Sequence, residues 1–118
     1  MARHKFAIIK NNVVANVKHY SGFPTEVAKN SLKPVLLKPS KLLLLYDTGA
    51  NGYELNRYDE DGNFAGDTWH PTEENATDQV LNEFNLKGIC WRDIPIEIDD
   101  PFDYAIQFMR KKIELNKI

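Results

Sequence analysis

Short runs of apolar and polar residues predict a succession of strands and helices in the first part of the chain. Residues 6–9 and 13–17 are rich in strand-forming side chains and are separated by Lys-Asn-Asn, so they predict a β-hairpin. Residues 24–29 begin with Pro-Thr and predict a short helix, which has to end before Pro34. The next residues, 35–38, are expected to be extended.

The middle of the chain has a clearer strand pattern. Residues 41–46, Lys-Leu-Leu-Leu-Leu-Tyr, form an unbroken apolar run that predicts a central strand buried on both faces. The segments 48–52 and 59–63 are rich in turn residues and flank a strand at 53–58. Residues 64–70 then complete a predicted three-stranded meander.

Two helices are predicted after the meander. The first covers residues 72–84, with Thr72 as its N-cap. Its apolar stripe consists of Ala76, Val80, Leu81 and Phe84. A short strand is expected at residues 89–95, and the last helix follows with Asp99 or Asp100 as its cap. The apolar face of that helix consists of Phe102, Ala105, Ile106, Met109 and Ile113.

This order of elements predicts one domain over residues 1–118 of the α+β class. We expect an antiparallel β-sheet of about five to six strands, including the meander, with two or three helices packed on one face. The apolar content of 42% argues against a disordered acidic chain. The lone Cys90 and the absence of a secretory or membrane-spanning segment predict a cytoplasmic protein.

Charge is distributed unevenly, although the formal net charge is only -2. Residues 1–46 carry 8 basic and 1 acidic side chains, residues 47–103 carry 3 and 15, and residues 104–118 carry 4 and 1. Some of the middle carboxylates complement the starts of helices. The others are expected to form a negative surface, which would attract a cationic partner.

A resemblance rests on the segments 59–63 (Asp-Glu-Asp-Gly-Asn) and 66–70 (Gly-Asp-Thr-Trp-His), followed by the helix from Thr72. The chain is similar here to small, mostly uncharacterised bacterial proteins in which such a strand precedes an acidic amphipathic helix. Some of those proteins resemble immunity proteins of polymorphic toxin systems. The matching positions include Thr72, Ala76, Gln79, Glu83, Phe84 and Trp91, and the departures are Glu73, Thr77 and Asn82.

The strand end at residues 67–70 is expected to be structural. Asp67 and His70 are three residues apart, so strand alternation places them on opposite faces and argues against an acid and base pair. We expect Trp69 to anchor the core, while Asp67, Thr68 and His70 form hydrogen bonds around the strand end and the helix start at Thr72.

Other candidate chemistries also have structural interpretations. The acidic segment 59–63 lacks the residue order of a calcium loop, so an exposed hairpin turn is expected. Cys90 is expected to be a buried structural thiol, and the three histidines and one cysteine do not form a zinc signature. We therefore expect no metal, no cofactor and no enzymatic activity.

Two functional hypotheses remain. The first is a non-enzymatic protein-binding domain, of the kind an immunity-type inhibitor represents, that docks a cationic toxin through an acidic surface. Its residues are Asp47, Glu54, Asp59, Glu60, Asp61, Glu73, Glu74, Asp78 and Glu83.

The second hypothesis is a small-ligand or nucleic-acid module that uses the basic, aromatic N-terminal hairpin, within a basic N-terminal third. Its residues are Arg3, Lys5, Phe6, Lys10, Lys18, Tyr20, Phe23, Lys29, Lys33, Lys38 and Lys41. The sequence pI of about 5.9 argues against a dedicated nucleic-acid binder, so we prefer the first hypothesis.

Overall fold

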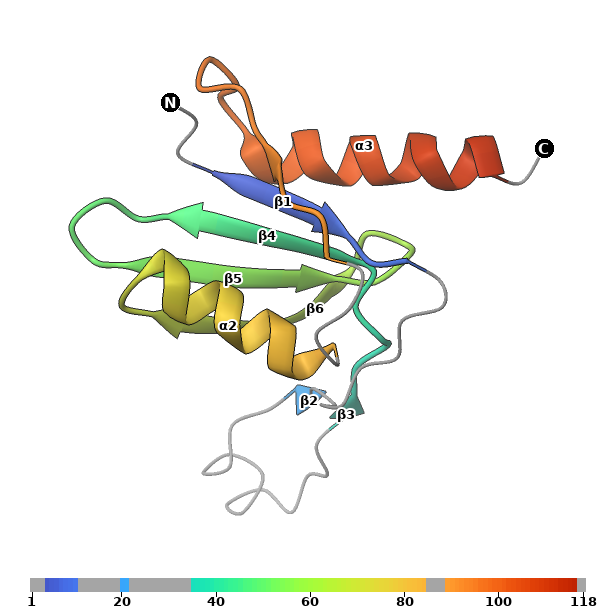
Figure 1. Ribbon diagram of the computed structural model, residues 1–118. Coiled ribbons are helices and arrows are strands. Elements are labelled where there is room, and N and C mark those ends of the chain that lie inside the picture. The colour runs from blue at the N-terminus through green and yellow to red at the C-terminus, as the bar shows by residue number, and fades with distance from the viewer. Residues whose placement is uncertain (1–3, 11–19, 22–34, 85–88, 117–118) are drawn as a thin grey trace.

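A five-stranded antiparallel sheet forms the centre of the protein and confirms the α+β class (Figure 1). The computed structural model describes residues 4–10, 20–21, 35–84 and 89–116. The sheet has the order β6-β5-β4-β1-β7. Its strands are β1 (Lys5–Ile8), β4 (Leu42–Asp47), β5 (Tyr53–Tyr58), β6 (Phe64–His70) and β7 (Arg92–Asp93).

Among the described residues, the remaining elements are two helices and a separate two-stranded sheet. The helices are α2 (Glu73–Glu83) and α3 (Pro101–Asn116), and the second sheet pairs β2 (Tyr20–Ser21) with β3 (Val35–Leu36). No helix in the described part of the chain is long and apolar enough to cross a membrane. The predicted strand at 13–17 and the predicted helix at 24–29 lie outside the described residues.

The predicted meander is confirmed by the strand register. Leu45 pairs with Leu55 of β5, and Leu55 pairs with Thr68 of β6. β1 lies on the other side of β4 and also pairs with β7. The strand expected at residues 89–95 is shorter than predicted, because only the two residues of β7 pair with β1.

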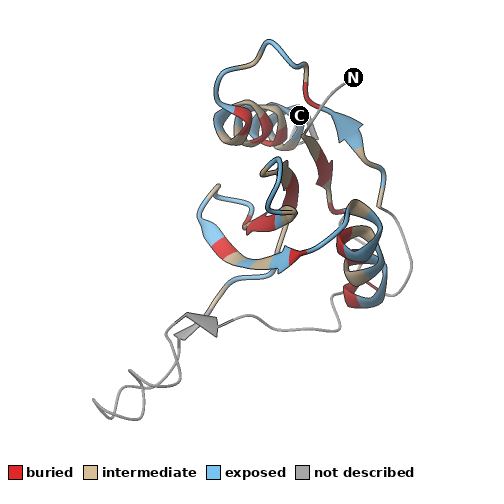
Figure 2. Cartoon of the chain, turned by 90° about the vertical axis from the view of Figure 1, so that its left-hand side faces the viewer, coloured by how far each residue is buried: buried red, intermediate tan, exposed pale blue. Residues whose placement is uncertain are grey.

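The two helices lie on opposite faces of the sheet, so the prediction that helices pack on one face is wrong (Figure 2). Leu42 and Leu44 belong to the cluster that contains Met109 of α3, whereas Leu43 belongs to the cluster that contains Val80 of α2. Successive residues of a strand point to opposite faces. The prediction that the central strand is buried on both faces is confirmed. Such burial requires a helix on each side of the sheet.

Both helices begin with the predicted caps. Thr72 Oγ1 accepts a hydrogen bond from the backbone N–H of Asn75 at 3.0 Å, and Asp100 Oδ1 accepts one from the N–H of Asp103 at 3.1 Å. The predicted stripe of α2 is confirmed at Ala76, Val80 and Phe84, which are buried. These three residues are spaced four apart, so they share one face of the helix. Leu81 lies outside that face and is exposed.

A buried ion pair attaches α2 to the sheet. Arg57 of β5 donates from Nε and Nη2 to Glu83 Oε2 of α2, with both distances at 3.1 Å. The two side chains are 0% and 1% exposed. Arg57 Nη1 also donates to Thr68 Oγ1 of β6 at 3.3 Å. One guanidinium therefore connects β5, β6 and α2.

The same network continues to the start of α2. Thr68 Oγ1 lies 2.7 Å from His70 Nε2, and His70 Nδ1 lies 2.8 Å from Asn75 Oδ1. Because Thr68 accepts from Arg57, its hydroxyl proton is free to be donated to His70 Nε2. This assignment, made from the network, leaves the ring proton on Nδ1, where it is donated to Asn75. The interior polar side chains on this face are thus mutually satisfied.

We expect Glu83→Gln to lower the free energy of unfolding by about 3–5 kcal/mol, because it leaves the buried Arg57 cation without a counter-charge. Adding Arg57→Met should restore much of that loss. Urea denaturation measures both effects. Glu74→Gln, at an exposed carboxylate of the same helix, is the matched control. Equal losses for Glu83→Gln and Glu74→Gln would contradict this role of the pair.

Candidate functional site

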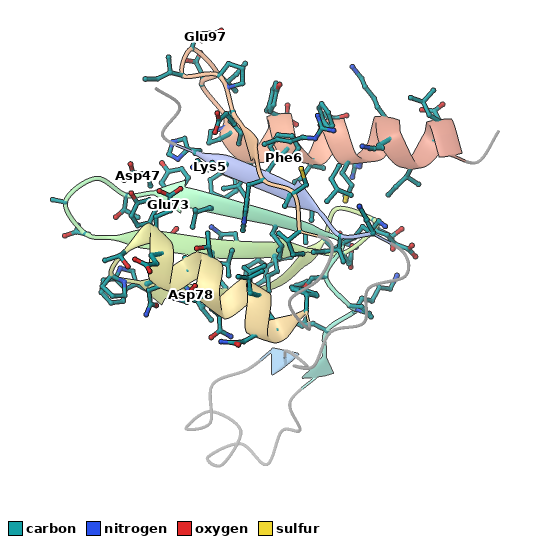
Figure 3. All side chains as sticks on the ribbon, in the orientation of Figure 1. Lys5, Phe6, Asp47, Glu73, Asp78 and Glu97 are labelled. Atoms are coloured by element: carbon teal, nitrogen blue, oxygen red, sulfur yellow. The ribbon has the colours of Figure 1, made fainter. Side chains whose placement is uncertain are left out.

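The carboxylates predicted to form one surface lie at different ends of the sheet. Glu60 and Asp61 lie in the turn that follows β5, whereas Glu73 and Glu74 begin α2, which follows β6. Since β6 runs antiparallel to β5, these two groups are separated by roughly the length of a strand, about 20 Å. In Figure 3, Glu73 lies near Asp47 at one end, and Asp78 lies further along α2.

Two of the predicted surface carboxylates are buried, and their assignment to a partner surface is corrected. Glu83 is held by Arg57, as described above. Asp59 Oδ1 accepts hydrogen bonds from the backbone N–H groups of Asp61 and Asn63, at 2.9 and 3.0 Å. Asp59 therefore shapes the β5–β6 turn, which confirms the hairpin predicted there.

Basic residues from the first third of the chain neutralise two further predicted carboxylates. Lys5 Nζ lies 2.7 Å from Glu73, and Lys38 Nζ lies 2.7 Å from Asp61. The hydrogen bond to Glu73 raises the pKa of Lys5. The predicted acidic surface is therefore partly cancelled at both ends of the sheet.

These contacts also bear on the basic, aromatic surface of the second hypothesis. Lys5 and Lys38 are ion-paired, and Phe6 is buried in the core. Six other residues of the second hypothesis lie outside the part of the chain whose side chains are described, namely Arg3, Lys18, Tyr20, Phe23, Lys29 and Lys33.

One part of the sheet has no helix over it in the described part of the chain. α3 packs on β4 and reaches Tyr58 at one end of β5, and α2 packs on β5 and β6 from the opposite side, so no described helix covers the rest of the α3 side of β5 and β6 (Figure 2). The strand register places six side chains on this surface, which we call the open face. They are Glu54, Asn56 and Tyr58 of β5 and Phe64, Asp67 and Trp69 of β6.

The open face carries two large aromatic side chains in contact with solvent. Trp69 is 60% exposed and Phe64 is 52% exposed. The prediction that Trp69 anchors the core is therefore wrong. Thr68 and His70 point into the polar network beneath α2, so Trp69, between them, points to the uncovered side. Its indole Nε1 donates to the carbonyl of Asn51, which holds the ring beside the β4–β5 turn.

Phe64 is the exposed end of a row of rings along the α3 side of the sheet. It contacts Tyr58 edge-on at 6.5 Å between centroids, and Tyr58 contacts Phe102 of α3 at 6.4 Å. Phe102 stacks on Tyr46 at 5.3 Å, and Tyr46 stacks on His4 at 4.3 Å. The open face is thus continuous with a packed aromatic row, which limits the freedom of its aromatic side chains.

The open face is also negatively charged. Glu54 and Asp67 are exposed, and neither forms an ion pair with any residue that the structure describes. Burial raises the pKa of the Tyr58 hydroxyl, and the charges of Asp100, Asp67 and Glu54 raise it further. Three carboxylates, one each from β5, β6 and the start of α3, therefore act on the same side chain.

A buried polar side chain whose donor atom has no partner among the described residues lies in the middle of the open face. Asn56 is 7% exposed and pairs in register with Leu44 on one side and Asp67 on the other. Its Nδ2 has no hydrogen-bond partner, and it is the one such buried side-chain atom in the described part of the protein. No sequence signal distinguishes Asn56, because a strand asparagine more often faces solvent.

The remaining candidate chemistries do not converge on a reactive centre. Asp67 lies on the open face and His70 on the α2 side, as strand alternation predicts. Cys90 is exposed, so the prediction of a buried thiol is wrong. Across the described ranges, no three His, Cys, Asp or Glu side chains are placed to hold a metal ion. The open face is suited to binding a group with positive charge.

We expect Glu54→Gln with Asp67→Asn to lower the pKa of Tyr58, because two negative charges that disfavour the phenolate are removed. The pKa should stay above 10.0, the ordinary value, because burial remains the larger cause. Titration of the tyrosine ring carbons by NMR measures it. Glu60→Gln with Asp78→Asn removes the same charge elsewhere and should leave the pKa unchanged. An equal effect of both variants would contradict the described geometry.

No protein-family model matches the chain, and neither the curated proteins nor the solved structures contain a match. The resemblance to bacterial proteins with a Gly-Asp-Thr-Trp-His motif therefore remains a prediction.

Proposed function

We propose that this chain is a non-enzymatic protein-binding domain that docks a basic partner through the open face. The observation that carries this proposal is the exposure of Trp69 and Phe64 beside the unpaired carboxylates of Glu54 and Asp67. Tryptophan and other aromatic residues are enriched at protein interfaces, where they supply large contact areas at low entropic cost.

The charge of the open face favours a cationic partner. Complementary charge accelerates association and discourages acidic partners. A nuclease toxin has to be basic to bind phosphates, so a toxin domain of this kind is the partner class that fits an immunity role. The proposal includes a cytoplasmic location, where the exposed free thiol of Cys90 stays reduced.

The alternative function, binding through the basic N-terminal third, has weaker support. Lys5 and Lys38 are engaged by Glu73 and Asp61, and Phe6 is buried. Stacking on a base or an aromatic ligand requires an exposed ring. Among the described residues, the exposed aromatic side chains lie on the open face, where the charge is negative.

The proposal is tested by capturing partners from the native cell on the immobilised protein. Substituting Trp69→Ala, Glu54→Gln and Asp67→Asn together should abolish capture of a basic protein. The control, Glu60→Gln, Glu74→Gln and Asp78→Asn, removes more charge from exposed positions elsewhere and should retain it. Equal capture by the two variants would exclude the open face as the docking surface.

Salt dependence tests the electrostatic part separately. Raising the ionic strength from about 0.01 M to about 0.15 M shortens the Debye length from about 30 Å to about 8 Å, so the association rate with the captured partner should fall steeply. Surface plasmon resonance measures that rate. A rate that does not depend on salt would contradict docking driven by carboxylates.

The immunity role has its own test in the arrangement of genes. We expect the gene immediately upstream to encode a large secreted protein with a variable, basic C-terminal domain. That domain, expressed alone, should lose its toxicity when this chain is co-expressed. An isolated gene would argue against an immunity role and would leave the protein-binding role in place.

A further inference from the structure

The six residues of the open face are arranged as a site for one cationic side chain on an extended peptide. We propose that the open face binds an arginine of its partner, with the guanidinium between Glu54 and Asp67 and a neighbouring backbone carbonyl on Asn56 Nδ2. This inference rests on the proposed protein-binding function and names the group that is recognised.

The positions of the two carboxylates follow from the strand register. Glu54 pairs with Trp69, and Asn56 pairs with Asp67, so Glu54 and Asp67 are diagonal neighbours on one face. Diagonal neighbours in an antiparallel pair are about 7–8 Å apart. Side chains that start at this spacing are able to bring their carboxylates to two edges of one guanidinium, where each charge-assisted hydrogen bond spans about 2.8 Å.

The aromatic side chains favour arginine over lysine. A guanidinium is planar and weakly hydrated, so it stacks on a ring while its edges donate hydrogen bonds. Trp69 lies directly across from Glu54, and its ring is held through Nε1 by the Asn51 carbonyl. The ring is therefore fixed against the β4–β5 turn, at the Glu54 end of the open face, before any ligand arrives. A lysine ammonium would be attracted by the two carboxylates but could not stack on the Trp69 ring, because it is not planar.

Asn56 supplies the reason to expect a peptide rather than a free cation. Its Nδ2 is a donor that lacks an acceptor in the free protein, which is unfavourable for a buried group. An anionic acceptor would be repelled by Glu54, Asp67 and Asp100, which act together on the adjacent Tyr58. A neutral acceptor next to a cation matches the backbone carbonyl of an arginine-containing segment. Because Nδ2 is buried in the free protein, the side chains around it have to move when this carbonyl binds.

The test is an NMR titration of the intact protein with the peptide acetyl-Gly-Arg-Gly-amide. Saturable shifts are expected for the Asn56 side-chain amide and for the Trp69 indole. The Trp91 indole packs in the cluster on the α2 side and should not shift. The citrulline peptide has the same shape without the charge and should give no saturable shift. The lysine peptide should bind about tenfold more weakly, which corresponds to one lost charge-assisted hydrogen bond.

Variants locate the peptide. Glu54→Gln with Asp67→Asn should raise the Kd of the arginine peptide at least about tenfold, whereas Glu74→Gln with Asp78→Asn should not change it. Equal binding of the citrulline or lysine peptide would overturn the arginine assignment. The assignment would also fail if the arginine peptide caused no shift, or if both double variants bound it equally.

The outcome is distinguishable from that of the partner-capture experiment. If the Trp69, Glu54 and Asp67 triple variant loses its partner while the arginine peptide does not bind, the docking surface stands and the arginine assignment is wrong. If the peptide binds but the triple variant still captures the partner, the site exists and the proposed function is wrong.

Discussion

β4 brings four leucines in succession into the centre of the sheet, and all four are buried. Alternation along the strand sends Leu42 and Leu44 to one side and Leu43 to the other, so the sheet needs apolar cover on both faces. α3 provides it over β1 and β4, and α2 provides it on the opposite side over β5 and β6. The two helices are thus offset across the sheet. The uncovered surface of β5 and β6 is the geometric result of that offset.

The polar network beneath α2 stabilises this arrangement from the opposite side. Arg57 joins Glu83 to Thr68, and the chain of hydrogen bonds continues through His70 to Asn75 at the start of the helix. Such a network keeps α2 on its side of β5 and β6, because moving the helix would leave a buried charge unpaired. The side chains between the network residues then face outward, away from α2. Residues of the polar network and residues of the open face therefore alternate along the same two strands.

Much of the fold could be predicted because its signals are local. The turn residues of the meander, the cap at Thr72 and the double burial of residues 42–45 all depend on near neighbours in the sequence. The side of the sheet that each helix covers depends on the path of the chain between elements, which periodicity does not encode. Trp69 shows the same limit: alternation predicts that it lies opposite His70, but not that its side is uncovered.

The acidic surface was only partly predictable for a related reason. Counting carboxylates does not reveal which of them are used internally, as Asp59 and Glu83 are. The burial of Glu83 could have been predicted from Arg57. This residue lies two positions after the buried Leu55 and shares its face of the strand, and a buried cation requires an acid from another element. Asn56 carries no comparable signal. Its importance depends on the absence of an acceptor in the folded protein, which only the three-dimensional structure shows.

The central claim is that the open face is the surface covered by a partner, and oxidative footprinting of the complex tests it most directly. The account predicts that Trp69 and Phe64 are protected from hydroxyl radicals when the captured partner is bound. Ile96, between β7 and α3, and Leu115 of α3 are comparably exposed and should react as in the free protein. Unchanged oxidation of Trp69 and Phe64 in the complex would contradict the account.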